Sequence, residues 1–476
     1  MGCRNGARAA NETGYRTASY SRRKRRSCVA LAWLAATLPA VAQESVIEDA
    51  PTLTIAAVGD MMLGTEYPDD RLPDDDGKGF LAAVTPWLAG ADVAFGNLEG
   101  VLADGGEPGK KCSNPAACFR FRSPVRYADH FVAAGFDVLS LANNHARDFG
   151  EDGRTITMRV LTDAGILHSG RVGTFTSFEK NGMRIALIAY AVTKNSNMML
   201  DYLFAERTIR ELDEGHDIVV VSFHGGAEGA EYTHVTFDEE EYYGEPRGDV
   251  VRFARLAVDA GADLVLGHGP HVVRAMERYN DRLIAYSLGN FATHFGISIN
   301  GLAGVAPILV ARLDREGRFV DGQIISTVQQ RPHGPVPDPA GRARRVIESL
   351  SREDFGESGL EFRADGALLP VERAPVARRT DFGADDDPGE NGPKPCNENW
   401  FWLVESTVKR PDEAAIGPEP GTAAWQGAIM QRLGLNGLGP NGLGPNGLGP
   451  NGFGPKGTDA AANDPAAVAW CEMIDR

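Results

Sequence analysis

The chain has 476 residues, of which 43% are hydrophobic and 24% are charged, so it can bury a large core and is neither fibrous nor wholly disordered. Lys and Arg number 48 against 65 Asp and Glu, which gives a net charge of −17. This acidity argues against nucleic acid or an anionic membrane surface as the partner of the chain.

The first 42 residues have the layout of a secretory signal peptide, so we expect an exported, periplasmic or extracellular protein. A basic run at 22–26 precedes an apolar stretch at 28–38, and small residues follow at 40–42. Because the apolar stretch is short and ends at Pro39, we expect no stable membrane span; an uncleaved leader that tethers the protein to a membrane is the alternative. Removing residues 1–42 leaves 40 basic and 64 acidic residues, a net charge of about −24.

Four cysteines remain after the leader, in a compartment where disulfides persist. Cys112 lies close to Cys118 in the sequence, while Cys396 and Cys471 bracket the C-terminal region, so we expect each of these two pairs to form a disulfide. Four free thiols are the alternative. Because no CxxC spacing occurs, a structural zinc site built from sulfur is not predicted.

Between Leu53 and about Gly356, short apolar runs alternate with helical patterns, which is typical of a layered α/β domain. We assign this domain to residues 52–356. The runs predict strands over 53–58, 92–95, 137–142, 184–191, 217–223, 262–266 and 282–288. Two helices are predicted at 124–134, capped by Ser123 and stopped by Gly135, and at 249–260.

Residues 357–476 read as a Pro-, Asp- and Gly-rich tail, with one apolar run at 400–404 that predicts an added edge strand. Within the tail, residues 436–455 repeat Asn-Gly-Leu-Gly-Pro four times, the last copy with Phe453 in place of Leu. Two Gly and one Pro in every five residues oppose both helix and sheet, so we expect a flexible spacer. An array of short binding motifs is the alternative.

Polar residues follow the predicted strands at their C-terminal ends, where loops of a parallel sheet converge. These residues are Asp60, Glu99, Asn143, Asn144, His145, His224, Glu228, His268 and His271. Carboxylate, imidazole and amide donors together suit Mn, Fe or Zn rather than calcium, and one or two such ions can activate water for hydrolysis. Taken singly, Asp60 can cap a turn, Glu99 can be a surface acid and His145 can be a structural histidine; their shared position favours a site.

The motifs at these strand ends resemble the CapA family of poly-γ-glutamate capsule biosynthesis proteins, in the calcineurin-like metallophosphoesterase superfamily. The resemblance covers roughly Leu53 to Gly356 and implies a four-layer αββα sandwich with its site at the ends of the sheets. The motifs that carry it are Val-Gly-Asp-Met-Met-Leu-Gly at 58–64, Asn-Leu-Glu at 97–99, Asn-Asn-His at 143–145, His-Gly-Gly-Ala-Glu at 224–228, Gly-His-Gly-Pro-His at 267–271 and Tyr-Ser-Leu-Gly-Asn-Phe at 286–291.

The resemblance also implies roles for single residues. The first ion would be held by Asp60 and His271, and Glu99 would bridge it to a second ion. The ligands of the second ion would be Asn144, His224 and His268. The catalytic pair would be His145, as general acid toward the leaving group, and Asp148, which steadies it. The substrate-binding candidates are Asn143, Glu228, Ser287 and Asn290.

One departure from the superfamily pattern affects the first ion. Superfamily phosphatases carry Asp-x-His at the first strand, whereas this chain has Asp60-Met61-Met62. A thioether is a poor ligand for hard divalent ions, so the first ion is one ligand short and a single bound ion is an open alternative.

The function predicted from these residues is an exported, metal-dependent hydrolase linked to capsule or poly-γ-glutamate synthesis or processing. Hydroxide on a mono- or dinuclear site would attack a phosphoester or a γ-glutamyl amide. The expected partners are an anionic polymer such as poly-γ-glutamate, or a phosphoester, together with proteins of capsule synthesis and export. The alternative is a non-catalytic factor that binds the polymer through its metal and assists capsule assembly or export.

Overall fold

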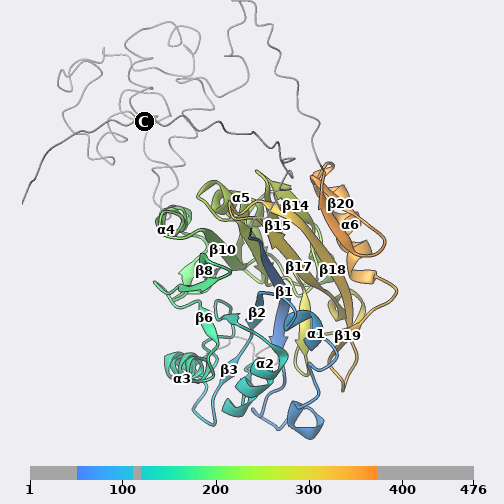
Figure 1. Cartoon of the computed structure of the whole chain (residues 1–476). Coiled ribbons are helices and arrows are strands. Elements are labelled where there is room, and N and C mark those ends of the chain that lie inside the picture. The colour runs from blue at the N-terminus through green and yellow to red at the C-terminus, as the bar shows by residue number, and fades with distance from the viewer. Residues whose placement is uncertain (1–50, 111–118, 372–476) are drawn as a thin grey trace, which may run out of the picture. The chain divides into compact units, whose positions relative to one another are not determined.

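The computed structural model describes residues 51–110 and 119–371, which form two β-sheets stacked face to face with helices on the outer faces (Figure 1). The expected leader, all four expected disulfide cysteines, the strand at 400–404 and the repeat lie outside these residues. No helix of the described ranges is long and apolar enough to cross a membrane.

The first sheet has ten strands, and its centre is parallel while one side is antiparallel. Strand β1 pairs in parallel with β2 and antiparallel with β17. The strand order is β20 (Leu360–Phe362), β21 (Ala367–Pro370), β18 (Phe319–Gln329), β17 (Val305–Leu313), β1 (Leu53–Met62), β2 (Val93–Leu98), β5 (Val138–Ser140) and β6 (Leu167–Ser169), with β16 (Asn290–Thr293) on β1 and β19 (Pro335–Pro337) on β18.

The second sheet has seven strands and a parallel centre of continuous apolar runs, as expected for strands covered on both faces. The strand order is β14 (Met276–Tyr279), β15 (Arg282–Ala285), β13 (Leu264–His268), β10 (Ile218–His224), β8 (Met183–Ala191) and β7 (Thr176–Lys180), with β9 (Asn197–Met198) on β8. Two small ribbons complete the strands: β3 (Val101–Leu102) with β4 (Arg122–Ser123), and β11 (Glu240–Tyr242) with β12 (Glu245–Gly248).

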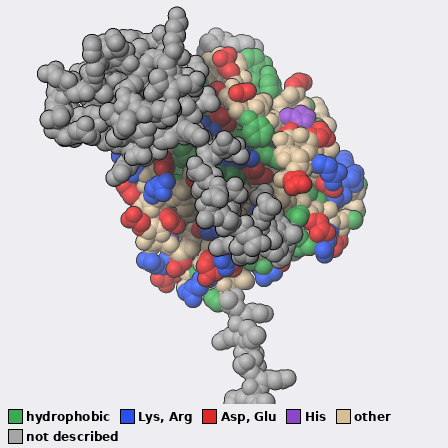
Figure 2. Space-filling view, turned by 90° about the horizontal axis from the view of Figure 1, so that it is seen from above, with side chains coloured by type: hydrophobic (Ala, Val, Ile, Leu, Met, Phe, Trp, Pro, Cys, Tyr) green, Lys and Arg blue, Asp and Glu red, His purple; other side chains and the backbone are tan. Residues whose placement is uncertain are grey.

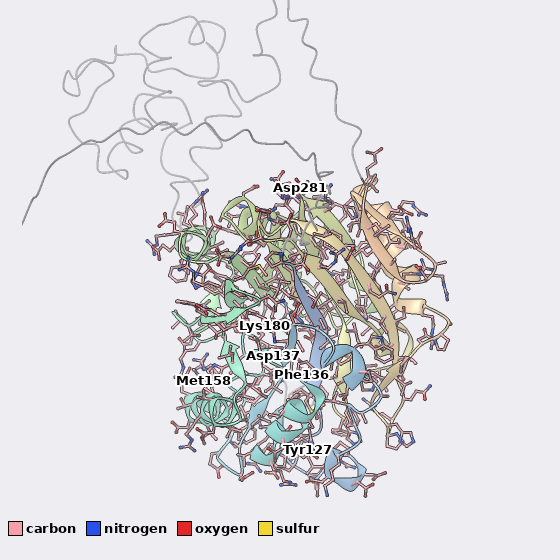
Figure 3. The ribbon with its side chains drawn as sticks, viewed as in Figure 1. Tyr127, Phe136, Asp137, Met158, Lys180 and Asp281 are labelled. Atoms are coloured by element: carbon pink, nitrogen blue, oxygen red, sulfur yellow. The ribbon has the colours of Figure 1, made fainter. Side chains whose placement is uncertain are left out.

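Three buried clusters define four layers. One cluster joins inward-facing residues of both sheets, a second joins the other face of the first sheet to α1, α2 and α3, and a third joins the other face of the second sheet to α4 and α5. Figure 3 labels three residues of the second cluster or packed against it, Tyr127, Phe136 and Met158. The helices are α1 (Thr85–Leu88), α2 (Ala128–Ala134), α3 (Gly150–Asp163), α4 (Tyr202–Asp213), α5 (Val250–Asp259) and α6 (Arg342–Phe355).

The structure confirms the predicted αββα sandwich, and each of the seven predicted runs overlaps a strand. The helix expected at 249–260 is α5, where the Asp249 side chain accepts a hydrogen bond from the backbone NH of Arg252. The helix expected at 124–134 begins with a 3₁₀ turn at Val125–Tyr127 before α2, and Gly135 ends it in the left-handed conformation. Ser123 does not cap this helix, because its hydroxyl donates to the carbonyl of Gly64.

One sequence-based boundary needs correction, and one hairpin was missed. The domain does not end near residue 356, because β20 and β21 pair with each other and extend the first sheet through β18. The tail therefore begins after Pro370 at the earliest. The long hairpin of β17 and β18 was also not predicted; β18 has partly exposed positions along much of its length and polar residues among its apolar ones, which is a weaker signal than a continuous apolar run.

Residues 286–289 cross from the second sheet to the first and hold the two sheets together at one end. The backbone NH of Leu288 donates to Gly267 at the end of β13, and the NH of Asp60 donates to Gly289. A Cβ on Gly59 would lie 1.9 Å from the carbonyl oxygen of Gly289, so only glycine permits this approach. The strand ends of both sheets therefore lie next to each other at this crossover.

Candidate metal centre

Three side chains from three strand ends come together where the sheets meet. Asp60 lies in β1, Glu99 directly follows β2, and His271 follows β13. Each offers one ligand atom, and these atoms all lie within 4.8 Å of one another. The carboxylates of Asp60 and Glu99 are fully buried, while 16% of the His271 side chain is exposed. The cluster is therefore enclosed by protein but reachable from solvent on the side of His271.

Strand register explains this convergence. In the first sheet, Asp60 lies opposite Asn97 in the parallel β1–β2 pair, so Glu99 lies two residues further along on the same face. In the second sheet, His224 lies opposite His268 in the parallel β10–β13 pair. The carboxyl ends of both parallel segments thus bring their polar residues to one edge, as the sequence predicted.

Asn97 connects the two sides of the centre, and the sequence analysis did not assign it a role. Its Nδ2 donates to Asp60 Oδ1 at 2.9 Å and lies 3.4 Å from His224 Nδ1, while its Oδ1 accepts from Asn143 at 3.1 Å. The period-2 alternation of β2 puts Asn97 on the same face as Glu99, and this signal could have identified it.

Buried polar atoms without hydrogen-bond partners show that the centre suits a cation. Both carboxylate oxygens of Glu99, Nε2 of His224 and Oδ1 of Asn144 are buried and have no hydrogen-bond partner among the described residues. Such groups cost free energy unless something satisfies them. Oxygen and imidazole nitrogen donors together fit Mn²⁺, Fe²⁺ or Zn²⁺. Asp60, Glu99 and His271, with His224 beside them, are thus the residues that would hold a divalent ion.

The pKa values of Asp60, Glu99 and His271 depend strongly on one another. Burial and the neighbouring carboxylate of Asp60 raise the pKa of Glu99 to about 8. Burial alone would also raise the pKa of Asp60, but the hydrogen bond and charge of His271 hold that pKa well below its usual range. Burial opposes the charged form of His271, yet Glu99 and Asp60 raise its pKa to about 10. Without a metal, the cluster holds protons that a cation would have to displace.

Asn290 holds His271 in place, while its predicted contact with substrate stays a prediction. The Asn290 amide nitrogen donates to the carbonyls of Ser298 and Ala303, so its Oδ1 is left as the acceptor for His271 Nδ1 at 2.9 Å. Asp60 Oδ2 lies 3.0 Å from the same nitrogen. The imidazole ring is therefore oriented by one hydrogen bond to Asn290 and by an ion-pair contact with Asp60 on the same side.

Replacing Asn290 with Ala should weaken Mn²⁺ binding by about 10–100-fold, because it removes an outer-shell acceptor that orients His271. The measurement is a calorimetric titration of the purified protein with Mn²⁺. Asn280→Ala is the matched control, since the Asn280 amide donates to Asp259 at the surface, away from His271, and its loss should leave Mn²⁺ affinity unchanged. Equal affinities of a folded Asn290→Ala protein and the parent would contradict this role.

His145 and Asp148 form the pair that the resemblance implied. His145 Nδ1 lies 2.8 Å from Asp148 Oδ2, which also accepts a hydrogen bond from the backbone NH of Phe121. Asp148 is fully buried, and the ammonium of Lys110 lies 3.5 Å from its other oxygen. Burial lowers the pKa of His145 by more than Asp148 raises it, so the neutral ring prevails near pH 7. His145 must therefore take up a proton before it can act as an acid.

His268, a predicted ligand, and Met62, at the position predicted to lack one, both have partners outside the cluster. His268 is fully buried between the sheets, where Nε2 donates to the carbonyl of Val58 at 3.2 Å and Nδ1 lies 3.4 Å from the hydroxyl of Ser222. Its role as a ligand stays a prediction. Met62, which follows Asp60 by two residues, is buried in an apolar cluster with Phe121 and Ile297. The site thus gains no third nitrogen donor from this strand.

The remaining candidates are used largely by the local fold. Asn143 donates to Leu98 and Asn97 and accepts from the backbone NH of His145, so it holds its own loop. The hydroxyl of Ser287 donates to Val272 and accepts from Gly289 within the crossover. For both residues, substrate binding stays a prediction. Glu228 is one-fifth exposed and has one oxygen 3.9 Å from His271 Nε2.

Comparison with known proteins identifies several relatives. The chain is 28% identical over 263 residues to the capsule biosynthesis protein CapA of Bacillus anthracis, covering 50% of this chain and 59% of that protein. It is 28% identical over 318 residues to the PGA biosynthesis protein CapA of Bacillus subtilis, covering 63% and 78%. A solved calcineurin-like phosphoesterase, YfkN from Bacillus subtilis, matches with a TM-score of 0.30 at 12% identity, over 64% of this chain and 97% of that one.

A family model, described as the bacterial capsule synthesis protein PGA_cap, matches residues 54–294. This range includes Asp60, Glu99, the 143–148 loop, His224 and His271. It covers more than half of the chain and contains every residue of the cluster described above. The chain therefore belongs to the PGA_cap family of bacterial capsule synthesis proteins.

Proposed function

We propose that the protein is an exported, metal-dependent hydrolase that processes an anionic polymer of the cell envelope, such as poly-γ-glutamate, or a phosphoester formed during its assembly. The observation that carries the proposal is the buried Asp60–Glu99–His271 cluster, in which Glu99 has no hydrogen-bond partner for either oxygen. Membership of a capsule synthesis family, and the names of the two Bacillus relatives, support the choice of substrate. The expected leader supports export.

Each residue of the centre has its own role in this proposal. Asp60, Glu99 and His271 would hold a divalent ion, which when bound would supply Lewis-acid activation of water and of a substrate oxygen. His145 lies at the same strand ends, with Nδ1 fixed by Asp148 and Nε2 left to accept or donate a proton. Asn290 and Asn97 keep His271 and Asp60 in place. Asp60 and Glu99 are buried, so the low-dielectric surroundings strengthen their electrostatic interactions, while the partly exposed His271 leaves one side of the cluster open to solvent.

The test is metal analysis of the purified protein together with hydrolysis assays. We expect bound Mn, Fe or Zn, and release of product from bis(p-nitrophenyl) phosphate or from γ-linked glutamate oligomers that stops with a chelator and resumes with Mn²⁺. Which of the two substrates is cleaved distinguishes phosphoester from amide hydrolysis. A protein that binds no divalent metal, or one whose turnover is the same in chelator, would refute the proposal.

A second candidate function is metal-dependent binding of the polymer without turnover. The observations that favour it are Met62, buried in an apolar cluster where the superfamily has a ligand, and His268, whose Nε2 is used by the carbonyl of Val58. Both leave the centre with few nitrogen donors. Chelator-sensitive binding of γ-linked glutamate oligomers in a protein that cleaves none of the test substrates would support this function instead.

A further inference from the structure

Two buried arginines lie beside the loops of the second sheet, and their hydrogen bonding differs. Arg274 is fully buried and each of its three nitrogens has a partner: Nη1 and Nη2 each contact one oxygen of Glu240 at 2.7 Å, Nε donates to Tyr232, and Nη2 also donates to Ala227. This is the two-pronged pairing that an arginine and a carboxylate prefer. Arg274 is therefore explained by the fold alone.

Arg247, in β12, is left incomplete. Its side chain is 3% exposed; Nε donates to the carbonyl of Gly226 at 2.8 Å, and Nη1 contacts a single oxygen of Glu228 at 2.9 Å. Nη2 is buried and has no hydrogen-bond partner among the described residues. A guanidinium presents its donors as a rigid fork, so one prong of Arg247 is used and the other is not. Leaving a charged donor unpaired in the interior is costly, which indicates a role outside the fold.

The unpartnered Nη2 of Arg247 lies beside the metal centre. Nη2 is next to Gly269, between His268 and His271, since a Cβ built on Gly269 would lie 3.3 Å from it. Glu228 lies between Arg247 and the cluster: one oxygen contacts Arg247, and the other lies 3.9 Å from His271 Nε2. Because Glu228 is one-fifth exposed, solvent and solutes can reach this carboxylate, whereas Arg247 behind it is sealed off.

We propose that Arg247 recognises an oxyanion of the substrate, and that the Glu228 carboxylate occupies part of this recognition site until the substrate displaces it. The inference rests on the proposed function and adds to it the residue that selects a carboxylate or phosphate group. An incoming oxyanion can engage both Nη1 and Nη2, whereas Glu228 engages Nη1 alone. Glu228, predicted as a substrate-binding residue, is thereby reassigned as a competitor of the substrate.

The charge of the whole protein makes such a residue necessary. The chain carries a net charge of −17, and the face shown in Figure 2 mixes acidic and basic side chains. An anionic substrate is therefore repelled at long range and must find its compensating charge locally. Arg247 supplies that charge beside the cluster, and the low-dielectric surroundings strengthen its attraction for an anion.

The test measures the affinity of two oxyanions, inorganic phosphate and a γ-linked glutamate trimer, by calorimetry on Mn²⁺-loaded and on chelated protein. Glu228→Gln should tighten binding by about 10-fold, because the competing negative charge is gone while the shape of the side chain is kept. Arg247→Lys should weaken binding by about 10-fold, because an ammonium cannot form the two-pronged contact. The double variant should show no tightening, since the gain requires Arg247.

Glu206→Gln, on α4, is the matched control: it makes the same charge change in a carboxylate that pairs with Arg210 at the surface. It should not tighten binding. The proposal is overturned if Glu228→Gln binds both anions no more tightly than Glu206→Gln does. If Arg247→Lys fails to fold, as judged by thermal unfolding, the comparison of the two Glu→Gln variants still decides. Preference for phosphate or for the trimer identifies which oxyanion the site serves.

The same experiment separates this inference from the proposed hydrolase. Tightening by Glu228→Gln in a protein that binds no Mn²⁺ would support Arg247 as an oxyanion site while refuting the metal-dependent function. Mn²⁺-dependent hydrolysis with unchanged anion affinities in Glu228→Gln and Arg247→Lys would support the metal-dependent function while refuting Arg247 as an oxyanion site.

Discussion

Replacing Asp60 with Asn is expected to lower Mn²⁺ affinity by more than about 100-fold, a larger loss than that of an outer-shell residue. Asp60 is the one clustered carboxylate whose pKa is held low, so it carries the negative charge that attracts a cation near pH 7. The amide of Asn keeps the size and the acceptor for Asn97 but removes that charge. Metal-dependent hydrolysis should fall by more than about 1,000-fold in the same variant.

The measurements are Mn²⁺ titration and turnover, with thermal unfolding to confirm that the variant folds. Asp263→Asn is the matched control, because Asp263 is also a buried aspartate of this sandwich but contacts Val219 and Arg282 at the start of β13, away from the strand ends that carry the centre. It should change stability while leaving Mn²⁺ affinity as it was. An Asp60→Asn protein that binds Mn²⁺ as tightly as the parent would exclude Asp60 as a ligand.

The position of the centre could be predicted from the sequence because the residues that end parallel strands all lie at the carboxyl edge of the sheet. A continuous apolar run such as Ile218–Phe223 predicts a buried strand, and the polar residue that ends it, His224, must lie at the carboxyl edge. The same reasoning placed Asp60 and Glu99. It needed only local pattern and a general rule of sheet topology, and the structure agrees with it.

The orientation of each side chain could not be predicted in the same way. His268 and His271 are three residues apart, yet one faces Val58 across the gap between the sheets and the other faces Asp60. That choice depends on the distance between the sheets, which the packed side chains of both inner faces determine. A sequence pattern does not contain this distance.

Residues from separate ribbons were missed for a related reason. Arg247 comes from the β11–β12 hairpin, which joins neither main sheet, and only the folded chain brings it next to Gly269. In the sequence it follows Glu245 and Pro246 in a polar stretch that resembles a surface loop. Its near-complete burial is a tertiary property.

Mn²⁺ affinity is also expected to rise steeply with pH, because a cation must displace the protons held by the cluster. Glu99 has a pKa of about 8 and His271 of about 10, so near pH 7 both are protonated in the metal-free protein. Affinity should increase by about 10-fold per pH unit for each proton released. Calorimetry in buffers of different ionisation enthalpy counts these protons. A Glu99→Gln variant should release one fewer, and affinity independent of pH would contradict the assigned ligands.

The same protons determine how the stability of the chelated protein depends on pH. For Glu99 the folded pKa of about 8 exceeds its ordinary value of 4.5, and for His271 the folded pKa of about 10 exceeds 6.5. Each group therefore stabilises the fold fully below its ordinary pKa, and this contribution is lost as the pH rises through the folded pKa. The melting temperature of chelated protein should fall between about pH 6 and pH 9, whereas Mn²⁺ should stabilise the fold more at each step. If the melting temperature changes with pH in the same way with and without Mn²⁺, the ion does not bind at Glu99 and His271.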